Sequence, residues 1–466
     1  MPRKSLLPLL LAVAGLLAVL PSPAQAKTNQ SMTFEAPREL VYEPELRQEA
    51  FTTLESLGVR SLRIVLYWKT VAPDSDSRVK PGVDLSDPGS YNWTGYDEAI
   101  QGAVDHGWDV LLTVSGPVPR WATNGARDTV TRPSPREFQR FVSAVATHYR
   151  GKVRTYSVWN EPNQPQFLGP QFDARRRPAS PRIYRGLLFA ALRGLEDAGQ
   201  RDGVRVLMGE TSPQGTGRVV APLTFLRGAL CLSSSYKRDR KCDKVPVDGY
   251  AHHAYTTKAG PLYRPPSPNS VTIGVLPRLT RALDRAGTAG ALPKRLPVWL
   301  TEFGIQSVPD PTYGVSQATQ NEYRALAERM AWGNSRVVSF SQYLLRDDRP
   351  LAGETSSGRY AGFESGLRTA GGKDKLALDG FRLALSARRS GSGVSLWGIV
   401  RPARSRQKAV IEYTSDGRRF KKLATVTTST RGAFSKRTSS VRGRRYRVVW
   451  TAPGGERHTG PPVRVR

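Results

Sequence analysis

Residues 153–163 read VRTYSVWNEPN and join an apolar, β-rich run to the acidic motif Trp159-Asn160-Glu161-Pro162-Asn163. Residues 298–304, VWLTEFG, repeat this arrangement, because Glu302 follows a second apolar run. In a barrel of parallel strands, carboxylates at the C-terminal ends of the strands face the functional end of the fold. Either motif alone is also explained by a loop start or a solvated strand edge, so the surrounding pattern decides.

The middle of the chain alternates predicted strands with predicted helices. The strands are eight runs rich in β-branched and aromatic residues: Met32–Ala36, Ser61–Tyr67, Asp109–Val114, Val153–Trp159, Val204–Gly209, Val247–His252, Val298–Thr301 and Val337–Leu344. Apolar residues at helical spacing lie between them, as in Pro135–Tyr149, Tyr184–Leu195, Val271–Ala286 and Gln317–Trp332. Eight such units predict an α/β fold of the (β/α)₈ TIM-barrel type across residues 27–386. The rival, a doubly wound open sheet, usually carries a Gly-rich phosphate-binding turn after its first strand, and none is present.

The composition of the chain changes near Ser386. Residues 387–393, ARRSGSG, are polar and rich in Gly and Ser, which predicts a linker. Short alternating runs separated by turn residues follow: Val394–Ile399, Ala409–Tyr413, Leu423–Thr427, Arg445–Trp450 and Pro462–Val465. Runs of this length and spacing predict a small β-sandwich of immunoglobulin-like type over residues 394–466.

The 466-residue chain carries 70 Lys and Arg against 39 Asp and Glu, a formal net charge of +31. Its overall composition is that of a globular protein and excludes collagen-like, coiled-coil and wholly disordered chains. More than half of the net charge lies in residues 388–466, which contain 20 Lys and Arg and 3 Asp and Glu. Such a basic surface indicates nucleic acid, an anionic surface or an acidic polymer as partner.

The N-terminus has the three parts of a secretory signal peptide. Arg3 and Lys4 precede the apolar run Leu6–Leu20, and Ala24-Gln25-Ala26 matches the small-x-small cleavage pattern. An uncleaved membrane anchor is the alternative, but the run is shorter than the about 20 residues that span a bilayer. We therefore expect cleavage after Ala26, loss of residues 1–26, and a secreted chain with no stable membrane span. Export also argues against nucleic acid as a partner.

The sequence contains two cysteines, Cys231 and Cys242. An even number of cysteines in an exported chain predicts a disulfide. A zinc site needs more ligands than these two residues supply, and a catalytic thiol needs a His base beside it. A structural disulfide is therefore the favoured interpretation.

Two carboxylates at the ends of two barrel strands match the needs of glycosidic bond cleavage. One group must be protonated, to give a proton to the leaving oxygen, and the other must be ionised, to attack the anomeric carbon or to activate water. Glu161 and Glu302 are the candidates, and their chemistry needs neither a metal nor an organic cofactor. His252 and His253 are adjacent, but no third ligand for a metal is evident in the sequence.

Several segments share their residues with a known group of enzymes. Trp159-Asn160-Glu161-Pro162-Asn163 is the most specific of them. The others are Leu57–Ile64 with Trp68, Tyr91-Asn92-Trp93, Trp108–Leu112, Pro119–Ala122 and Gly362–Arg368. Through these segments, the region from about Met32 to Leu385 resembles the clan A glycoside hydrolases, and within them families 5 and 39. Strand eight departs from the pattern, because Phe340-Ser341-Gln342-Tyr343 stands where this clan often has a Trp.

The resemblance implies a retaining mechanism, with catalytic glutamates on strands four and seven. Glu161 would be the acid/base and Glu302 the nucleophile. Asn160 would hydrogen-bond the sugar 2-hydroxyl, a contact that strengthens in the transition state. Arg63 would lie beneath the nucleophile and keep it ionised, because a nearby cation favours the charged carboxylate.

Five further residues are candidates for the substrate site. Tyr255 matches the strand-six position that contacts the nucleophile in the resembling enzymes, and His253 matches a neighbouring position that faces the site. Trp68, Trp121 and Tyr343 end strands or begin loops on the catalytic face, so their rings are candidates for stacking on sugar faces. Packing in the core or at the rim is the alternative for these three rings.

The residues and the resemblance together predict a secreted retaining glycoside hydrolase that cleaves β-linked O-glycosidic bonds of a polysaccharide or oligosaccharide by double displacement. One alternative is a catalytically silent carbohydrate- or cell-wall-binding protein on the same scaffold. Another is transglycosylation by the same residues. For the basic C-terminal domain, a tether to an anionic cell wall or acidic polysaccharide stands against a basic surface inherited from an Arg-rich proteome.

Overall fold

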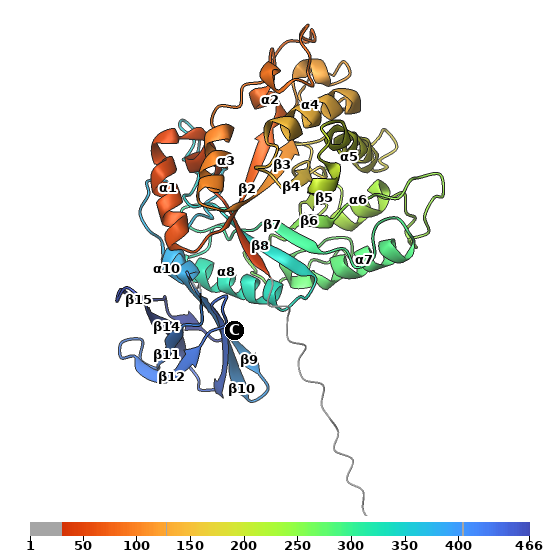
Figure 1. Cartoon of the computed structure of the whole chain (residues 1–466). Helices are drawn as coiled ribbons and strands as arrows, with labels where there is room; N and C mark the ends of the chain where they lie inside the picture. The colour runs from red at the N-terminus through yellow and green to blue at the C-terminus, as the bar shows by residue number, and fades with distance from the viewer. Residues whose placement is uncertain (1–29, 127, 403–404) are drawn as a thin grey trace, which may run out of the picture.

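Eight parallel strands close into a barrel in the computed structural model, which describes residues 30–126, 128–402 and 405–466 (Figure 1). The predicted signal peptide, residues 1–26, lies outside the described residues. Strands follow one another around the barrel in chain order, and β8 closes it by pairing with β1. They are β1 (Ser31–Glu35), β2 (Ser61–Tyr67), β3 (Asp109–Ser115), β4 (Thr155–Val158), β5 (Arg205–Thr211), β6 (Gly249–His253), β7 (Val298–Glu302) and β8 (Val337–Tyr343). The predicted (β/α)₈ architecture is therefore confirmed.

Alternation along each strand separates the inside of the barrel from its outer layer. In β2, Leu62 and Leu66 are buried in the large core that the strands share with the helices. Arg63 lies between these outward-facing positions and is turned the other way, into the barrel. A smaller apolar cluster occupies the same interior: Leu111, Leu207 and Ala251, with Trp299 packed against them.

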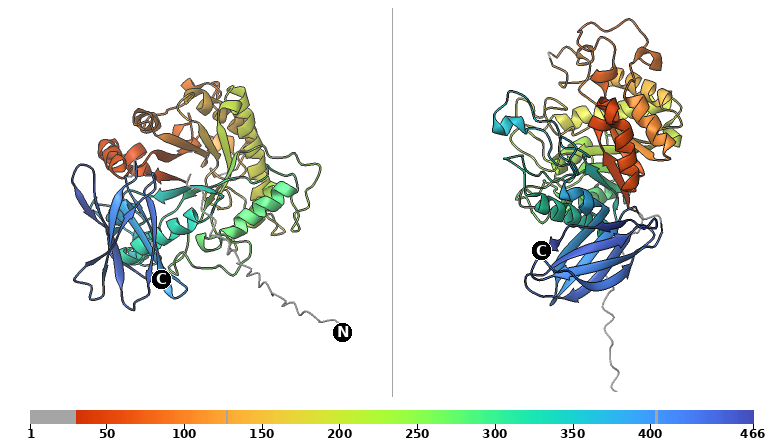
Figure 2. Two further views of the ribbon diagram at one scale, coloured as in Figure 1. Left: turned by 60° about the horizontal axis from the view of Figure 1, so that its bottom comes forward. Right: turned by 90° about the vertical axis from the view of Figure 1, so that its left-hand side faces the viewer.

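Helices surround the strands on the outside of the barrel (Figure 2). The longer helices are α1 (Pro44–Ser56), α3 (Tyr96–Asp105), α4 (Pro135–His148), α5 (Ser180–Asp197), α6 (Pro222–Ala229), α7 (Pro277–Thr288) and α8 (Gln317–Trp332). The short ones are α2 (Trp68–Val71), α9 (Ser356–Arg359), α10 (Leu376–Arg382), η1 (Arg38–Tyr42), η2 (Pro88–Ser90), η3 (Arg120–Ala122), η4 (Arg201–Gly203) and η5 (Ile273–Val275). Ser134 and Ser316 cap α4 and α8, because each side chain accepts a hydrogen bond from the backbone three residues on.

One predicted helix begins later than its apolar pattern indicates. The pattern Val271–Ala286 starts in the structure with the 3₁₀ turn Ile273–Val275, and α7 begins only at Pro277. Proline lacks a backbone N–H and is favoured at the first helical position, where no intrahelical bond is lost. Pro277 therefore sets the start of the helix.

The C-terminal region forms antiparallel sheets that fit a sandwich domain. One sheet has the order β13-β10-β9, and the other has the order β12-β11-β14-β15 with β16 paired to β14. The strands are β9 (Leu383–Ser390), β10 (Gly393–Val400), β11 (Lys408–Thr414), β12 (Lys421–Thr427), β13 (Ala433–Ser439), β14 (Arg445–Thr451), β15 (Arg457–Thr459) and β16 (Val463–Arg464). The alternating runs predicted five of these eight strands.

The structure corrects the linker predicted at residues 387–393. Residues up to Ser390 belong to β9, and Gly393 begins β10, so the Gly/Ser-rich stretch is a hairpin turn. Leu385 and Ala387 are buried in the core of the sandwich, which makes β9 a structural strand from its first residues. Gly391 adopts a left-handed φ of 59°, which glycine accommodates without strain.

The two domains meet along α8 through buried ion pairs. Glu328 pairs with Arg324 of the same helix and with Arg401, which follows β10. Glu322 accepts hydrogen bonds from the backbone of Arg464 at 3.0 Å and from the side chain of Arg466. A buried carboxylate is stable only while it is paired, so these contacts join the sandwich firmly to the barrel.

The predicted disulfide is confirmed. Cys231 and Cys242 are bonded, with their Cα atoms 6.3 Å apart, in the segment between α6 and β6. Within the described ranges, no helix combines the length and the apolar character needed to cross a membrane.

Candidate active site

The motif at residues 159–163 turns sharply at the end of β4. Trp159 and Glu161 both adopt left-handed backbone conformations, with φ values of 70° and 41°. The backbone N–H of Asn160 donates to the Ser115 hydroxyl at 2.9 Å, and that of Glu161 donates to the carbonyl of Glu210 at 3.1 Å. Strained backbone of this kind persists only where neighbouring groups hold it, and here neighbours on β3 and β5 do so.

Arg63 is the centre of the charged groups inside the barrel. Its guanidinium forms ion pairs with three carboxylates, Glu35, Glu210 and Glu302, the last at 3.0 Å. It also donates to the side-chain oxygen of Asn160 at 2.6 Å. Burial lowers the pKa of Arg63, but the three carboxylates raise it further, so it stays above its ordinary value and the guanidinium stays charged.

Glu302, the last residue of β7, is held by one donor at each carboxylate oxygen. The Tyr255 hydroxyl donates to Oε1 at 2.8 Å, and Arg63 donates to Oε2. Phe303 stacks on the Tyr255 ring at 5.9 Å and fixes it in place. Donors at both oxygens stabilise a negative charge on a carboxylate. The contacts that the resemblance implied for Arg63 and Tyr255 are therefore present.

Glu161 has the opposite environment. Its Oε1 lies 2.9 Å from Nδ1 of His253, which is the one side-chain hydrogen-bond partner of Glu161 among the described residues. Burial raises the pKa of Glu161 to about 8, against the lowering effect of Arg63 and with a further rise from Glu210. A carboxyl group in this setting keeps its proton at neutral pH. Glu302 differs from it, because hydrogen-bond donors contact both of its oxygens.

His253 lies beneath both glutamates. Its Nδ1 is 2.9 Å from Glu161 and 3.5 Å from Glu302. Burial lowers the pKa of His253, although Glu302 acts to raise it, so the ring is neutral. Its Nε2 is buried with no partner among the described residues. The single proton of the neutral ring therefore belongs on Nδ1, which lies next to an acceptor, Oε1 of Glu161.

A cavity of about 760 Å³ opens above these groups at the C-terminal ends of the strands. That volume lies within the range of about 300–1,000 Å³ typical of ligand sites. Residues predicted for the site that line it are Asn160, Glu161, Tyr255, Glu302 and Tyr343. Other residues come from the loops and strand ends around it: Glu35, Tyr67, Gln164, Gln214, Lys258, Asp310, Tyr313 and Phe363.

Four predicted substrate-binding residues do not line the cavity. Arg63 and His253 lie behind it, against the two glutamates, whereas Trp68 and Trp121 pack elsewhere. Trp68 is fully buried and stacks on Phe141 of α4, with ring centroids 5.0 Å apart. Trp121 meets Trp68 edge-on and donates its indole N–H to the Pro73 carbonyl at 3.1 Å. Trp68 begins α2 directly after β2, which turns it toward the outer helices. Tyr67, one residue earlier, lines the cavity instead.

Glu35 and Glu210 were missed by the sequence analysis. Glu35 ends β1 and Glu210 lies near the end of β5, so both carry the same signal as Glu302, an acid at the end of a strand. Glu210 is fully buried, accepts from Thr113 at 2.8 Å and serves to hold Arg63. Glu35 lines the cavity, with 5% of its side chain exposed. Burial raises its pKa to about 8, with Arg63 opposing and Glu302 adding to the shift.

His252 does not face the cavity. Its Nδ1 is 3.0 Å from the Thr211 hydroxyl and its Nε2 is 2.8 Å from the Val271 carbonyl, so both nitrogens have partners. Burial lowers its pKa to about 4. No group of three or more metal-ligating side chains with suitable geometry occurs in the part of the chain that the structure describes.

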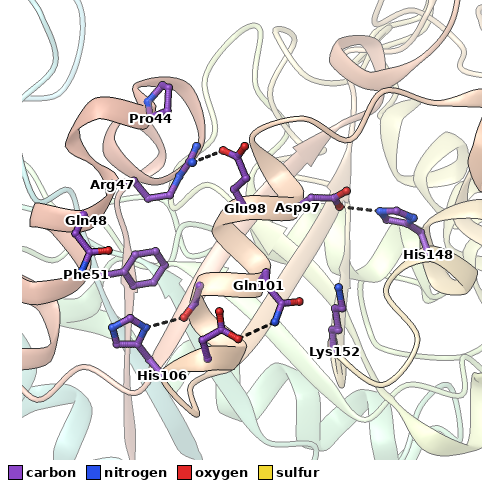
Figure 3. A pocket seen from close by; sticks show the side chains of 12 residues that line it. Pro44, Arg47, Gln48, Phe51, Asp97, Glu98, Gln101, His106, His148 and Lys152 are labelled. Carbon is purple, nitrogen blue, oxygen red and sulfur yellow. Dashed lines mark hydrogen bonds and ion pairs between the residues drawn. The ribbon is translucent and has the colours of Figure 1, made fainter.

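A second hollow, of about 620 Å³, lies beside α1 and α3 and is shown in Figure 3. Its polar groups are satisfied by one another. Asp97 pairs with Nε2 of His148 at 2.7 Å, and Arg47 forms an ion pair with Glu98. Its third carboxylate, Asp105, accepts from Gln101 at 2.7 Å, whereas Glu161 and Glu302 line the barrel cavity together, so the barrel cavity is the candidate active site.

Comparison with solved structures finds the same architecture in proteins of low sequence identity. A glucosidase from Croceicoccus marinus superposes with a TM-score of 0.54 at 11% identity, covering 91% of this chain and 95% of that one. A family 39 glycoside hydrolase from Bacteroides cellulosilyticus WH2 gives 0.53 at 16% identity, covering 90% and 80%. No protein-family model and no curated protein sequence matches the chain. At these identities the likeness establishes the fold.

Proposed function

We propose that the protein is a secreted retaining glycoside hydrolase, with Glu302 as nucleophile and Glu161 as acid/base. The observation that carries the proposal is the pair itself. Two carboxyl groups line one cavity, one held by donors at both oxygens and the other kept protonated by burial. Glycosidic bond cleavage needs one ionised carboxylate and one protonated carboxyl group. The named activities of the two structural neighbours, a glucosidase and a family 39 glycoside hydrolase, support the same class.

The spacing of the pair permits a retaining mechanism. One oxygen of Glu161 lies 2.9 Å from His253 Nδ1, and one oxygen of Glu302 lies 3.5 Å from the same atom. The two oxygens are therefore no more than 6.4 Å apart, just below the about 6.5–9.5 Å that separate the carboxyl groups of inverting enzymes. A pair at the shorter, retaining separation of about 5–5.5 Å has a nucleophile in direct reach of the sugar.

The chemistry proceeds in two balanced steps. Glu302 attacks the anomeric carbon and the bond to the leaving oxygen breaks, while Glu161 protonates that oxygen. Because Oε1 of Glu161 accepts from His253, the mobile proton is on Oε2, the oxygen without a protein partner. Water then attacks the glycosyl-enzyme, Glu161 takes its proton, and Glu302 leaves as a carboxylate.

Asn160 and Arg63 position these groups. The side-chain oxygen of Asn160 accepts from Arg63, so its NH₂ group is left to face the cavity. This orientation suits donation to a sugar hydroxyl beside the anomeric carbon, as the resemblance implied for the 2-hydroxyl. Arg63 does not itself line the cavity and acts through the side chains that it holds there.

The stereochemistry of the first product tests the proposal. Purified protein should be screened on β-linked glucans, xylans, mannans and bacterial exopolysaccharides, and the nascent product of an accepted substrate followed by proton NMR. The expected product has the anomeric configuration of the substrate. A product of inverted configuration would contradict the retaining mechanism but would still identify the protein as a glycoside hydrolase. Binding without turnover on every substrate would favour a silent carbohydrate-binding protein.

The alkaline limb of the pH–rate profile is a second prediction. Glu161 must carry its proton for the first step, and its pKa is raised to about 8, so kcat/KM should fall as the pH rises through about 8. The limb should disappear in Glu161→Ala measured on a substrate whose leaving group needs no protonation. Persistence of the limb in that variant would assign it to another group, with Glu35 the first candidate.

Glu35 is proposed to contact the sugar as a neutral carboxyl. Arg63 holds its Oε2, while Oε1 has no partner among the described residues and the side chain lines the cavity. Glu35→Ala should lower kcat/KM by about 10- to 100-fold, the range of one lost hydrogen bond to a charged or strongly polar group. Glu35→Gln, which keeps the shape of the neutral form, should lose less than about tenfold. Equal losses in the two variants would contradict a hydrogen-bonding role.

Secretion remains part of the proposal because residues 1–26 lie outside the described ranges. The disulfide between Cys231 and Cys242 is in keeping with an oxidising compartment. Mass spectrometry of the exported protein should find Lys27 as the first residue.

A further inference from the structure

A basic groove lies where the sandwich meets α8. Its volume is about 690 Å³, and its lining residues come from α8, β9, β10 and β13. Five of the eight are basic: Arg329, Arg388, Arg389, Lys436 and Arg437. Side chains alternate along a strand, so Arg388 and Arg437 share one face of the sheet, whereas Arg389 and Lys436 point to the other. The other three are Ser390, Ser395 and Ser435. The groove is separate from the barrel cavity, with which it shares no lining residue; the strands β9 and β10 that contribute to it lie below α8 in Figure 1.

The register of the sheet places two of the arginines in one row. Ser395 of β10 pairs with Arg388 of β9 on one side and with Arg437 of β13 on the other. Directly paired residues share a face of the sheet, and neighbouring strands are about 4.8 Å apart, so the two arginine backbones are about 10 Å apart. The small Ser395 between them leaves the floor of the groove open.

Arg329 of α8 adds a third fixed charge to this row. Its guanidinium donates to the Ser395 carbonyl and hydroxyl, both at 2.8 Å, and to the Ser386 carbonyl at 3.3 Å. All these acceptors are neutral. Burial, and then the charge of Arg388, lower the pKa of Arg329 to about 10, so it remains charged at neutral pH while its positive field is uncompensated.

Among the residues that the structure describes, no Asp or Glu lines this groove. Within the described residues, no ion pair involves Arg388, Arg389, Lys436 or Arg437. Elsewhere the protein pairs its cations: Arg346 and Arg368 both contact Glu49, and Arg447 of the sandwich contacts Glu412. Like charges gathered without a counter-charge repel one another and raise the local affinity for anions.

We propose that this groove is a binding site for an acidic polysaccharide, engaged through carboxylates spaced along the chain. Arginines about 10 Å apart in one row are met by repeated anionic groups on an extended ligand better than by one small ion. Arg also matches carboxylates with bidentate geometry. The choice of a polysaccharide rests on the proposed glycosidase function, whereas the requirement for a polyanion rests on the groove alone.

Charge reversal within the full-length protein tests the proposal. The double variant Arg388→Glu with Arg437→Glu changes the groove, and Arg418→Glu with Arg419→Glu makes the same change of net charge at the exposed β11–β12 turn of the other sheet. Deleting the domain is a poorer test, because Glu322 and Glu328 would lose their partners across the junction. Thermal unfolding of each variant reports whether the sandwich still folds.

Binding is measured against polygalacturonate at low salt, with a fully methyl-esterified pectin as the uncharged control polymer and duplex DNA as a competitor. We expect the affinity of the groove variant for polygalacturonate to fall more than tenfold and that of the turn variant to fall less than threefold. The esterified polymer should bind neither variant. Arg388→Gln with Arg437→Gln, a milder change, should show an intermediate loss.

Three outcomes would overturn the inference. Equal losses in the two charge-reversed variants would mean that net charge, rather than the groove, determines binding. Tighter binding of DNA than of polygalacturonate would make nucleic acid the ligand. No binding of either polymer by the unaltered protein would leave the groove without a polyanion. None of these results bears on turnover at Glu302, so failure here and failure of the proposed glycosidase function are distinguishable.

Discussion

Glu302→Gln is expected to lower kcat on any accepted glycoside by at least about 1,000-fold, equivalent to about 4 kcal/mol of transition-state stabilisation. An amide has almost the shape of the carboxylate but cannot form the glycosyl-enzyme. The Tyr255 hydroxyl can still donate to the remaining oxygen of the side chain, so the cavity keeps its form. Steady-state kinetics on the substrate found by screening, together with substrate binding by calorimetry, measure both effects.

Glu98→Gln is the matched control for this prediction. Glu98 is a surface carboxylate with 55% of its side chain exposed, and it lies beside the hollow in Figure 3 rather than in the barrel cavity. Its substitution should leave kcat unchanged. A 2-fluoro sugar with a good leaving group should label the unaltered protein covalently, and peptide mapping should place the label on Glu302. Full activity of the Glu302 variant, or a label elsewhere, would refute its assignment as nucleophile.

The parts of this site that the sequence predicted are those fixed by local pattern. An acid directly after an apolar run must lie at the end of a strand, and parallel strands bring their ends together. That reasoning placed Glu161 shortly after β4 and Glu302 at the end of β7, where the structure has them. Family resemblance then identified Arg63 and Tyr255, whose contacts with Glu302 are present in the structure.

The parts that the sequence did not predict depend on which way a side chain points. Successive residues of a strand face opposite sides, so an error of one position exchanges core for cavity. Tyr67 lines the cavity, whereas Trp68, already in α2, packs on α4. The ARRSGSG stretch has the composition of a linker, yet the pairing of β9 with β10 makes it a hairpin, because Gly and Ser suit a tight turn as well as a linker.

Glu35 shows a third limit of sequence reasoning. It has the same local pattern as Glu302, an acid that ends a strand of five residues, but it lies outside the segments on which the resemblance rests. Only the three-dimensional structure reveals that Glu35 and Glu302 share Nη1 of Arg63. The competition of two carboxylates for one cation is a property of tertiary contacts, and the raised pKa of Glu35 follows from its burial and from these neighbours.

The effect of Glu161→Ala on kcat/KM should depend on the leaving group of the substrate. On an unactivated glycoside, kcat/KM is expected to fall by at least about 1,000-fold, because no other group can deliver a proton to the leaving oxygen. On a dinitrophenyl glycoside, whose leaving group departs without a proton, formation of the glycosyl-enzyme should be nearly unchanged. The intermediate should then accumulate, since water no longer has a general base. Pre-steady-state release of dinitrophenol measures the first step apart from the second.

Azide provides the decisive check on the role of Glu161. The Ala variant leaves space beside Glu302 in the cavity, and a small anionic nucleophile needs no general base to attack the glycosyl-enzyme. Azide should therefore restore turnover of the dinitrophenyl glycoside and yield a glycosyl azide that retains the configuration of the substrate.

Gln164→Ala is the matched control variant, because it changes a side chain at the cavity wall without altering the acid/base. Asn163→Ala would be a poor control, because that buried amide holds the backbone turn through Ser212. Azide should leave the Gln164 variant unaffected, whereas rescue of both would show that azide acts elsewhere. A rescued product of inverted configuration would mean that azide attacks the substrate directly, with no covalent intermediate on Glu302.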